Sequence, residues 1–202
     1  MKHTIYLLTI VLTIASTTAT VAQTAPLTSE QRTEVLTAIA AAQKPKTGET
    51  LNYTFVQTKH SPLLADDAVS KGRMTLASDH TMQWQYTEPQ AFTLVVKGDS
   101  IYTVKDGQHN SLSGVGGKMA HGLAQMMMQM TDGASLSDGK LFETTLTEEG
   151  GTYRAILLPK RRDMKRMMQH AEFTFDRKTL RIKRVRLIEK NDSYTNIDFS
   201  LQ

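Results

Sequence analysis

The chain has 202 residues, of which 40% are hydrophobic and 22% charged, with a formal net charge of +4 and no cysteine. A chain of this length and composition can bury a real core, which excludes a disordered protein and a disulfide-stapled miniprotein. The absence of cysteine excludes thiolate zinc sites, iron–sulfur clusters and a lipid anchor on cysteine. The mild positive charge does not by itself indicate nucleic acid, and we expect no nucleic-acid partner.

The N-terminal segment has the features of a secretory signal peptide. A short positive start is followed by an apolar run of eleven residues at 5–15 and by small residues up to Ala22. The apolar run is far shorter than the roughly 20 residues that a membrane-spanning helix needs. We therefore expect a signal peptide at 1–22 and a single exported, periplasmic domain at 23–202.

The elements that follow begin with one helix and continue as strands. Residues 28–42 are predicted to be helical, because Thr28 and Gln31 can form a capping box and apolar residues follow at helical spacing. From residue 51 the apolar period changes to two, which is typical of half-buried strands. Turn-forming pairs such as Asp106-Gly107 separate the alternating segments, so consecutive strands should pair as antiparallel neighbours. Such segments recur to residue 201, one of them over 180–188, and predict about eleven strands.

Two segments that are rich in methionine interrupt the alternation. Residues 118–130 predict a helix with an apolar side made largely of methionine, and residues 160–170 predict a short basic helix or turn after Pro159. The fold class is therefore mainly β (α+β), with one helix, a long curled antiparallel sheet and two Met-rich helical inserts. The methionines are either ordinary core residues or, because Met is flexible and polarisable, an adaptable lining for acyl chains.

We expect the apolar strand faces and the methionines to form a hydrophobic container with a movable lid. Exposing one sixteen-carbon chain to water costs on the order of 12 kcal/mol, so a lipid that crosses an aqueous compartment needs a carrier. The candidate ligand-binding residues are Phe55, Met74, Leu76, Trp84, Leu94, Val96, Met119, Leu123, Met126, Met127, Met130, Met164, Met167 and Met168. The candidate residues for docking on a partner or a lipid headgroup are Lys160, Arg161, Arg162, Lys165 and Arg166.

The sequence carries no pattern that points to catalysis or to a metal. It has no Gly-x-Ser-x-Gly elbow, and the glycines before Lys118 lack the spacing of a phosphate-binding loop. The histidines show neither i, i+4 pairs nor cysteine partners, so nothing favours a metal site. We expect a binding protein without cofactor or metal, not an enzyme.

Several short motifs follow one another along the chain in a specific order and spacing. They are Phe55-x-Gln57-x-Lys59, Gly72, Trp84-x-Tyr86-x-x-Pro89, Val96-x-Gly98-Asp99, Leu157-x-Pro159-Lys160, Met164-Lys165-x-Met167, Phe175-Asp176 and a final hairpin with Glu189, Asp192 and Thr195. Together they resemble the LolA family of periplasmic outer-membrane lipoprotein carriers, especially its shorter relatives in Bacteroidetes-type bacteria. The resemblance extends from residue 28 to residue 201.

The resemblance implies an incomplete β-barrel of about eleven strands, lidded by helices, whose hydrophobic interior takes the acyl chains of lipoproteins. It also implies an inner-membrane ABC exporter that loads the carrier and an outer-membrane acceptor that unloads it, and we expect the carrier to be a monomer. Many carriers have Arg-Pro shortly before the aromatic-x-Trp pair, where this chain has Ser78 and Asp79. The resemblance therefore does not extend to a lid latch built on that arginine.

Two alternatives remain open at this point. The same fold could carry or sense a free lipid or a polyene-type product, because a fold does not fix its ligand. The basic stretches 160–166 and 177–190 could instead serve an interaction module that docks on an anionic membrane or on a partner protein. Basic residues on an outward strand face are, however, more often simply solvated.

Overall fold

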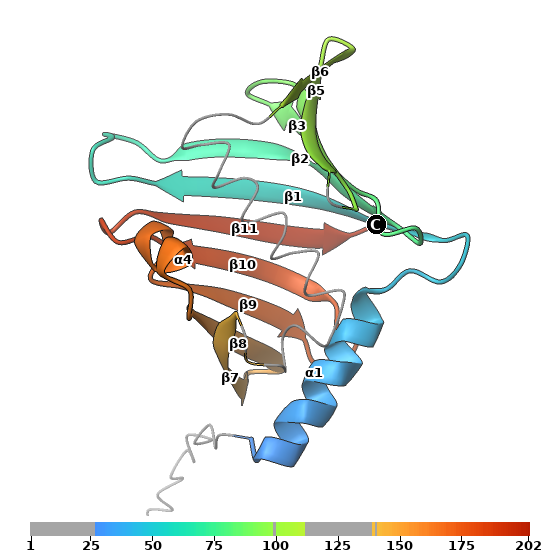
Figure 1. The fold of residues 1–202 in the computed structure, drawn as a ribbon, viewed down its shortest axis with the longest axis vertical. Helices are drawn as coiled ribbons and strands as arrows, with labels where there is room; N and C mark the ends of the chain where they lie inside the picture. Colours follow the sequence, from blue (N-terminus) through green and yellow to red (C-terminus); the bar gives the residue numbers. More distant parts are fainter. Residues whose placement is uncertain (1–26, 99, 112–138, 140) are drawn as a thin grey trace, which may run out of the picture.

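The computed structural model describes residues 27–98, 100–111, 139 and 141–202. Within these residues a helix, α1 (Ser29–Gln43), precedes the strands, and a second helix, α4 (Arg162–Met167), lies between the eighth and ninth strands (Figure 1). The strands are β1 (Thr50–His60), β2 (Ala68–Ala77), β3 (Met82–Glu88), β4 (Phe92–Lys97), β5 (Ser100–Lys105), β6 (Gln108–Ser111), β7 (Phe142–Glu149), β8 (Thr152–Pro159), β9 (His170–Asp176), β10 (Ile182–Ile188) and β11 (Tyr194–Leu201).

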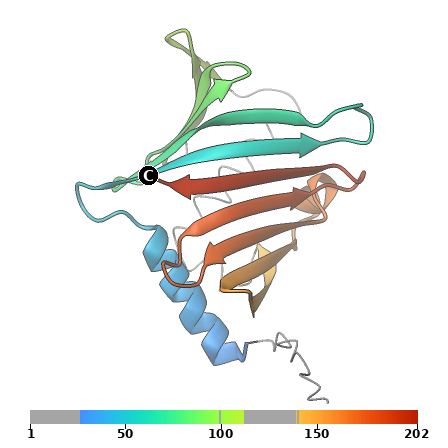
Figure 2. The ribbon, with the colours of Figure 1, turned by 180° about the vertical axis from the view of Figure 1, so that it is seen from behind.

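The described strands form one antiparallel sheet of eleven strands. Their order is β6-β5-β4-β3-β2-β1-β11-β10-β9-β8-β7, so β6 and β7 are the two edges and do not pair with each other. The sheet curls strongly toward β6 but does not close (Figures 1 and 2). The prediction of a curled antiparallel sheet of about eleven strands that forms an incomplete barrel is confirmed.

The predicted N-terminal helix is confirmed with a shift of one residue. Thr28 is its N-cap, and the backbone N–H of Gln31 donates to Thr28 Oγ1 at 3.3 Å while the backbone N–H of Thr28 donates to Gln31 Oε1 at 3.0 Å. This capping box satisfies two of the backbone donors that a helix start leaves unpaired. Leu36 and Ile39 of α1 belong to the hydrophobic core of the sheet.

The C-terminal end of α1 is fixed to the turn between β9 and β10. The buried Gln43 side chain donates to the carbonyl of Leu180 at 2.7 Å and accepts from the backbone N–H of Ile182 at 3.4 Å. The guanidinium of Arg181 donates to the carbonyl of Ala42. Burial of Gln43 is tolerated because its polar atoms have partners, and the helix is thereby held at one end of the sheet.

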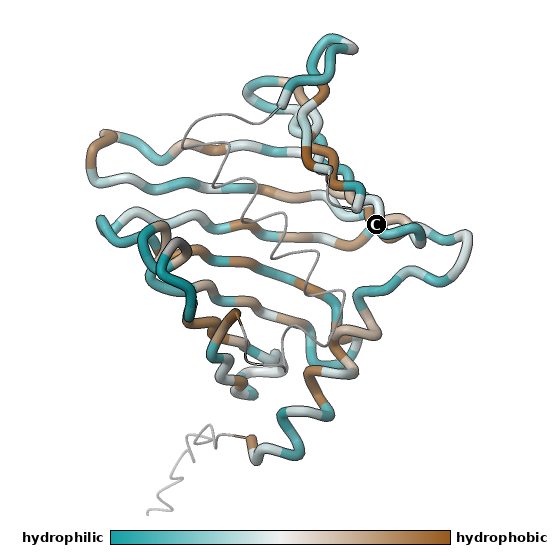
Figure 3. The backbone as a smooth tube through the Cα atoms, in the orientation of Figure 1, coloured by the Kyte–Doolittle hydropathy of each residue, from teal (hydrophilic) through white to brown (hydrophobic). Residues whose placement is uncertain are grey.

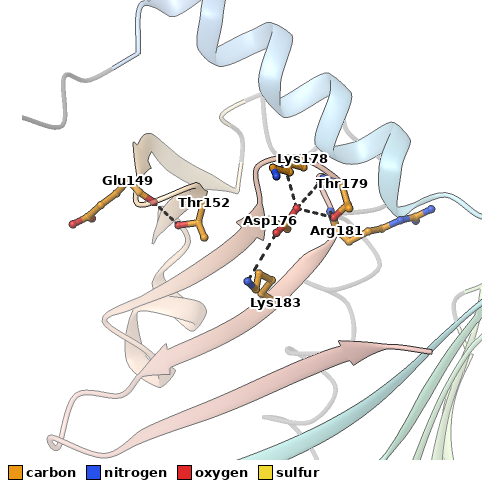
Figure 4. A network of polar contacts seen from close by, with 7 residues as sticks. All are labelled: Glu149, Thr152, Asp176, Lys178, Thr179, Arg181 and Lys183. Carbon is orange, nitrogen blue, oxygen red and sulfur yellow. Dashed lines mark hydrogen bonds and ion pairs between the residues drawn. The ribbon is translucent and has the colours of Figure 1, made fainter. Parts of the chain in front are cut away.

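The same turn is organised by the carboxylate of Asp176. Its Oδ1 accepts from the backbone N–H groups of Lys178 at 3.0 Å and of Thr179 at 2.9 Å, while Lys183 Nζ lies 3.9 Å from Oδ2 (Figure 4). The hydrogen bond from Thr179 is the largest of the contributions that hold the pKa of the Asp176 carboxyl below its usual value. The second residue of the Phe175-Asp176 motif therefore has a structural role in this turn.

Strand β10 begins later than the sequence predicts. Leu180, expected in a strand over 180–188, has a φ of 58° and closes the turn by donating its backbone N–H to the carbonyl of Asp176 at 2.8 Å. A left-handed residue cannot continue an extended strand. The strand therefore starts at Ile182.

Candidate functional site

One face of the sheet is lined by apolar side chains, and we call it the inner face. The register places Tyr53, Met74, Trp84 and Leu94 opposite one another in a row across β1 to β4. All four are at most 4% exposed. Apolar segments recur along the middle of the central strands (Figure 3).

The inner face continues on the other side of β1. Val185 of β10 pairs with Ile197 of β11 and with Phe173 of β9, and none of these three side chains is exposed. Both described helices contribute to the same hydrophobic cluster, α1 through its own apolar side chains and α4 through Met164, with Met168 just beyond its end. The helices therefore cover the inner face rather than the outer one.

The structure places part of the candidate ligand-binding set on this face. The strand residues Phe55, Met74, Leu76, Trp84, Leu94 and Val96 are all buried in one cluster, together with Met168. Met164 packs against the cluster, and Met167 is partly buried. The remaining candidates, Met119, Leu123, Met126, Met127 and Met130, lie outside the described residues. Contact of any of these residues with a ligand stays a prediction.

Aromatic rings form the centre of the inner face. Phe55 makes edge-to-face contacts with Trp84 and Tyr86, with ring centroids 5.3 and 5.2 Å apart. Phe199 of β11 adds contacts to Trp84 at 5.9 Å and to Tyr53 at 6.0 Å. We call Tyr53, Phe55, Trp84 and Phe199 the aromatic cluster. Its rings join strands from both halves of the sheet, because β11 pairs with β1.

Two polar atoms of the aromatic cluster have no hydrogen-bond partner among the described residues. They are the hydroxyl of Tyr53 and the indole Nε1 of Trp84, and both are shielded from solvent. The hydroxyl of Tyr86, by contrast, donates to Gln57 Oε1 at 2.9 Å. Burial raises the pKa of Tyr53 and, despite the bond to Gln57, raises the pKa of Tyr86 to about 12, so both phenols keep their protons at neutral pH.

The inner face becomes polar toward the end of β1. Gln57 and Lys59 follow Phe55 at a period of two, so the three side chains of this motif share one face. Lys59 Nζ lies 3.9 Å from Glu189 Oε1, and the two side chains are 41% and 14% exposed. The motif thus leads from the apolar middle of the face to a partly buried ion pair at its end.

The basic segment after β8 is less helical than the sequence predicts. Within 160–170 only Arg162–Met167 is helical, and Met168 is the C-cap with φ −136° and ψ 155°. Met168 therefore does not share a helix face with Met164 and Met167 but turns its side chain into the core. The candidate docking residues are all exposed at this end of the sheet: Lys160, Arg161, Arg162, Lys165 and Arg166.

An open groove of about 420 Å³ lies between this segment and the ends of β7 and β8. Its lining combines three lysines and one glutamate with apolar side chains, and Lys165 and Lys190 have no ion pair with any residue that the structure describes. Such a groove suits a ligand or surface that is anionic and partly apolar. The lining residues are Glu143, Leu158, Pro159, Lys160, Lys165, Met168, Gln169 and Lys190.

The outer face of the sheet carries charged pairs. Arg184 Nε lies 2.6 Å from Asp198 Oδ1, and Glu172 Oε1 lies 2.8 Å from Arg154 Nη2 and 3.1 Å from His170 Nε2. Burial alone would raise the pKa of Glu172, but the hydrogen bonds from Arg154 and His170 outweigh it and lower that pKa. The two faces therefore differ in kind, with mainly apolar packing inside and ion pairs outside.

Sequence reasoning left several residues of this region out of the candidate set, among them Tyr53, Phe199 and Lys190. Tyr53 belongs to the same period-two face as Phe55, so the sequence did carry a signal for it. Phe199 reaches the aromatic cluster only through the pairing of β1 with β11, and Lys190 reaches the groove through the hairpin of β10 and β11. Contacts between residues so distant in the chain leave no local pattern.

The described residues show neither a membrane-spanning helix nor a metal site. Both described helices are too short or too polar to cross a membrane. No group of three or more His, Asp or Glu side chains in the described ranges is arranged to hold a metal ion.

An open, curled antiparallel sheet with an apolar inner face and a charged outer face defines an incomplete barrel of the lipid- or lipoprotein-carrier type. The family model of the outer membrane lipoprotein carrier protein LolA matches residues 46–202. The chain therefore belongs to the LolA family, as its motifs predict. A comparison with curated protein sequences gave no match.

Three of the solved structures found by a structural comparison have little sequence in common with this chain. A LolA superfamily protein from Nitrosomonas europaea is 13% identical, with a TM-score of 0.42 over 83% of this chain and 91% of that one. A putative outer membrane lipoprotein-sorting protein domain from Vibrio parahaemolyticus is 8% identical, with a TM-score of 0.44 over 87% and 94%. The Mycobacterium tuberculosis lipoprotein LppX is 10% identical, with a TM-score of 0.40 over 83% and 94%. Family membership rests on the family model.

Proposed function

We propose that this protein is a periplasmic carrier that shields lipoprotein acyl chains on its inner face and delivers them toward the outer membrane. The observation that carries the proposal is a continuous apolar face on an open sheet, in a chain that belongs to the LolA family. Cargo would come from an inner-membrane ABC exporter and pass to an outer-membrane acceptor. The signal peptide expected at 1–22 supports the periplasmic location.

The physical task of such a carrier is binding, and no catalysis is needed. Transfer of an acyl chain from water to an apolar site is favourable by about 0.8 kcal/mol per CH₂, so contact with apolar side chains is sufficient to hold it. The buried strand residues of the inner face supply such contacts. The charged outer face supports solubility of the loaded carrier.

Native mass spectrometry of the protein purified from its own periplasm tests the proposal directly. We expect a bound mass that corresponds to an acylated lipoprotein. Replacement of Leu94 by Gln should lower the occupied fraction, because it places an amide among apolar side chains. The matched control, Val56→Gln, changes a 42% exposed side chain on the outer face and should leave occupancy unchanged.

The identity of the bound mass separates the proposal from its alternatives. A free lipid or a polyene would favour a carrier of different cargo on the same fold. Protein that carries no acylated ligand and also takes up no fluorescent fatty acid would contradict the proposed function.

We also propose that the basic segment and the groove beside it dock on an anionic headgroup or an acidic partner during transfer. The exposed side chains of Lys165 and Lys190, which have no ion pair with described residues, support this role. Each cation near an anionic membrane contributes about 1 kcal/mol, and the attraction decays over roughly 8 Å at physiological salt.

The double variant Lys165→Gln/Lys190→Gln should therefore load or deliver cargo more slowly at low ionic strength, by about fivefold or more. The deficit should shrink as salt is raised, because screening weakens the same attraction in the unmodified protein. The double variant Lys44→Gln/Lys46→Gln removes the same charge near the end of α1 and should have little effect. A deficit that is equal at low and high salt would exclude electrostatic docking.

A further inference from the structure

Two hydrogen-bond donors are buried in the aromatic cluster without acceptors from residues 27–98, 100–111, 139 or 141–202. Tyr53 is 2% exposed and Trp84 is 1% exposed, and neither the Tyr53 hydroxyl nor Trp84 Nε1 has a hydrogen-bond partner in the part of the chain that the structure describes. Both rings pack against Phe199, with centroids 6.0 and 5.9 Å away. The two donors therefore lie in the same apolar region of the inner face.

An unpaired buried donor costs stability, because it gives up water without gaining a replacement. Phenylalanine would fill nearly the same volume as Tyr53 without this cost, and the same core already contains Phe55, Phe173 and Phe175. Packing alone therefore does not account for the hydroxyl. A buried polar atom that is unsatisfied in the ligand-free protein is explained if a ligand brings the acceptor.

We propose that the Tyr53 hydroxyl and the Trp84 indole N–H donate hydrogen bonds to the carbonyl oxygens of the ester or amide groups through which acyl chains are attached to the cargo. The inference rests on the proposed function and adds a polar recognition element to it. The acyl chains themselves would lie against the apolar side chains of the inner face.

The chemistry of the two donors selects this class of ligand group. An indole N–H can only donate, and the burial that raises the pKa of Tyr53 keeps its hydroxyl protonated at neutral pH. A carbonyl oxygen can only accept, so donor and acceptor match. Among the described residues no charged side chain is buried, and the guanidinium of Arg181, which acts electrostatically on the Tyr53 phenol, already donates to the carbonyl of Ala42, so the surroundings favour a neutral carbonyl over a phosphate.

Paired probes of equal chain length test the inference. We would measure the Kd of a diacylglycerol and of its dialkyl ether analogue, which lacks the carbonyls, by displacement of a fluorescent fatty acid. The unmodified protein should bind the ester more tightly, by about fivefold for each hydrogen bond. Tyr53→Phe and Trp84→Phe should each reduce the ratio of ether Kd to ester Kd by about fivefold, while the Kd of the ether changes much less.

Tyr86→Phe is the matched control, because the hydroxyl of Tyr86 already donates to Gln57. Tyr86→Phe should leave the ratio of the two Kd values unchanged. It should lower the urea midpoint of the ligand-free protein, because Gln57 Oε1 then loses its donor. Tyr53→Phe should keep or raise that midpoint, because it removes an unpaired hydroxyl.

The outcomes separate this inference from the proposed function. If the unmodified protein binds ester and ether equally, the inference is overturned and the carrier function stands. If Tyr53→Phe lowers the urea midpoint as much as Tyr86→Phe does, the hydroxyl is already paired without ligand, which also overturns the inference. If neither probe binds at all, the proposed function fails and the inference fails with it.

Discussion

Replacement of Trp84 by alanine is expected to lower the free energy of unfolding by about 3–5 kcal/mol. Trp84 is 1% exposed, and its ring contacts Phe55 and Phe199. Removal of the indole takes away these contacts and leaves a cavity that the surrounding strands can close only in part. Urea denaturation gives the free energy of unfolding. Far-UV circular dichroism is the appropriate signal, because Trp84 is the only tryptophan of the chain.

The control for Trp84 is a truncation on the opposite face of the sheet. Val56→Ala removes part of a side chain that is 42% exposed on β1, so the loss should stay within about 0.5 kcal/mol. A loss below about 1 kcal/mol for Trp84→Ala would mean that the indole is not part of a packed core, contrary to the burial of the aromatic cluster.

Replacement of Gly72 by alanine is expected to destabilise the protein by about 2–3 kcal/mol, although only one methyl group is added. A Cβ at this position would overlap the carbonyl oxygen of Gln85 and lie 2.7 Å from Cζ of Phe55. The register of β2 with β3 shifts between Lys71 and Gly72, so the backbone of the neighbouring strand comes unusually close there. Urea denaturation of the variant measures the loss.

Gly48→Ala separates this steric effect from the general cost of replacing a glycine. Gly48 has a φ of 79° and open space where the Cβ would lie, so alanine there should cost only about 1–2 kcal/mol through backbone strain. In Gly72→Ala the ring of Phe55 should also move, which changes its edge-to-face contacts with Trp84 and Tyr86. Unchanged stability of Gly72→Ala would contradict the close approach of β2 and β3.

Local patterns predicted most of the elements because their causes are local. The capping residues Thr28 and Gln31 lie three positions apart, and the pair Asp106-Gly107 takes the positive φ angles of 52° and 76° that a tight hairpin needs. The alternation of apolar residues specified which strand residues share a face, so Phe55, Trp84 and Val96 could be grouped from the sequence.

The prediction was less accurate where a residue's conformation depends on distant partners. Leu180 continues an apolar pattern but takes a turn conformation, in which its carbonyl accepts from Gln43 at the end of α1. Met168 fits a helical wheel but ends the helix and enters the core. In both cases a tertiary contact outweighs a local preference. Burial of a side chain, or pairing of a buried polar group, contributes more free energy than the helix or strand propensity of one residue.

The sequence by itself determined the elements, the alternation of apolar and polar faces and, through the order of its motifs, the family. Only the tertiary structure decided that β1 pairs with β11, which does not follow it in the chain, and thereby that Phe199 packs against Tyr53 and Trp84. It also decided that the donors of Tyr53 and Trp84 have no acceptor within the described ranges, while the hydroxyl of Tyr86 donates to Gln57. The physical reason is the separation along the sequence of the residues that interact. Periodicity and capping depend on residues a few positions apart, whereas the pairing of β1 with β11 joins segments almost 150 positions apart.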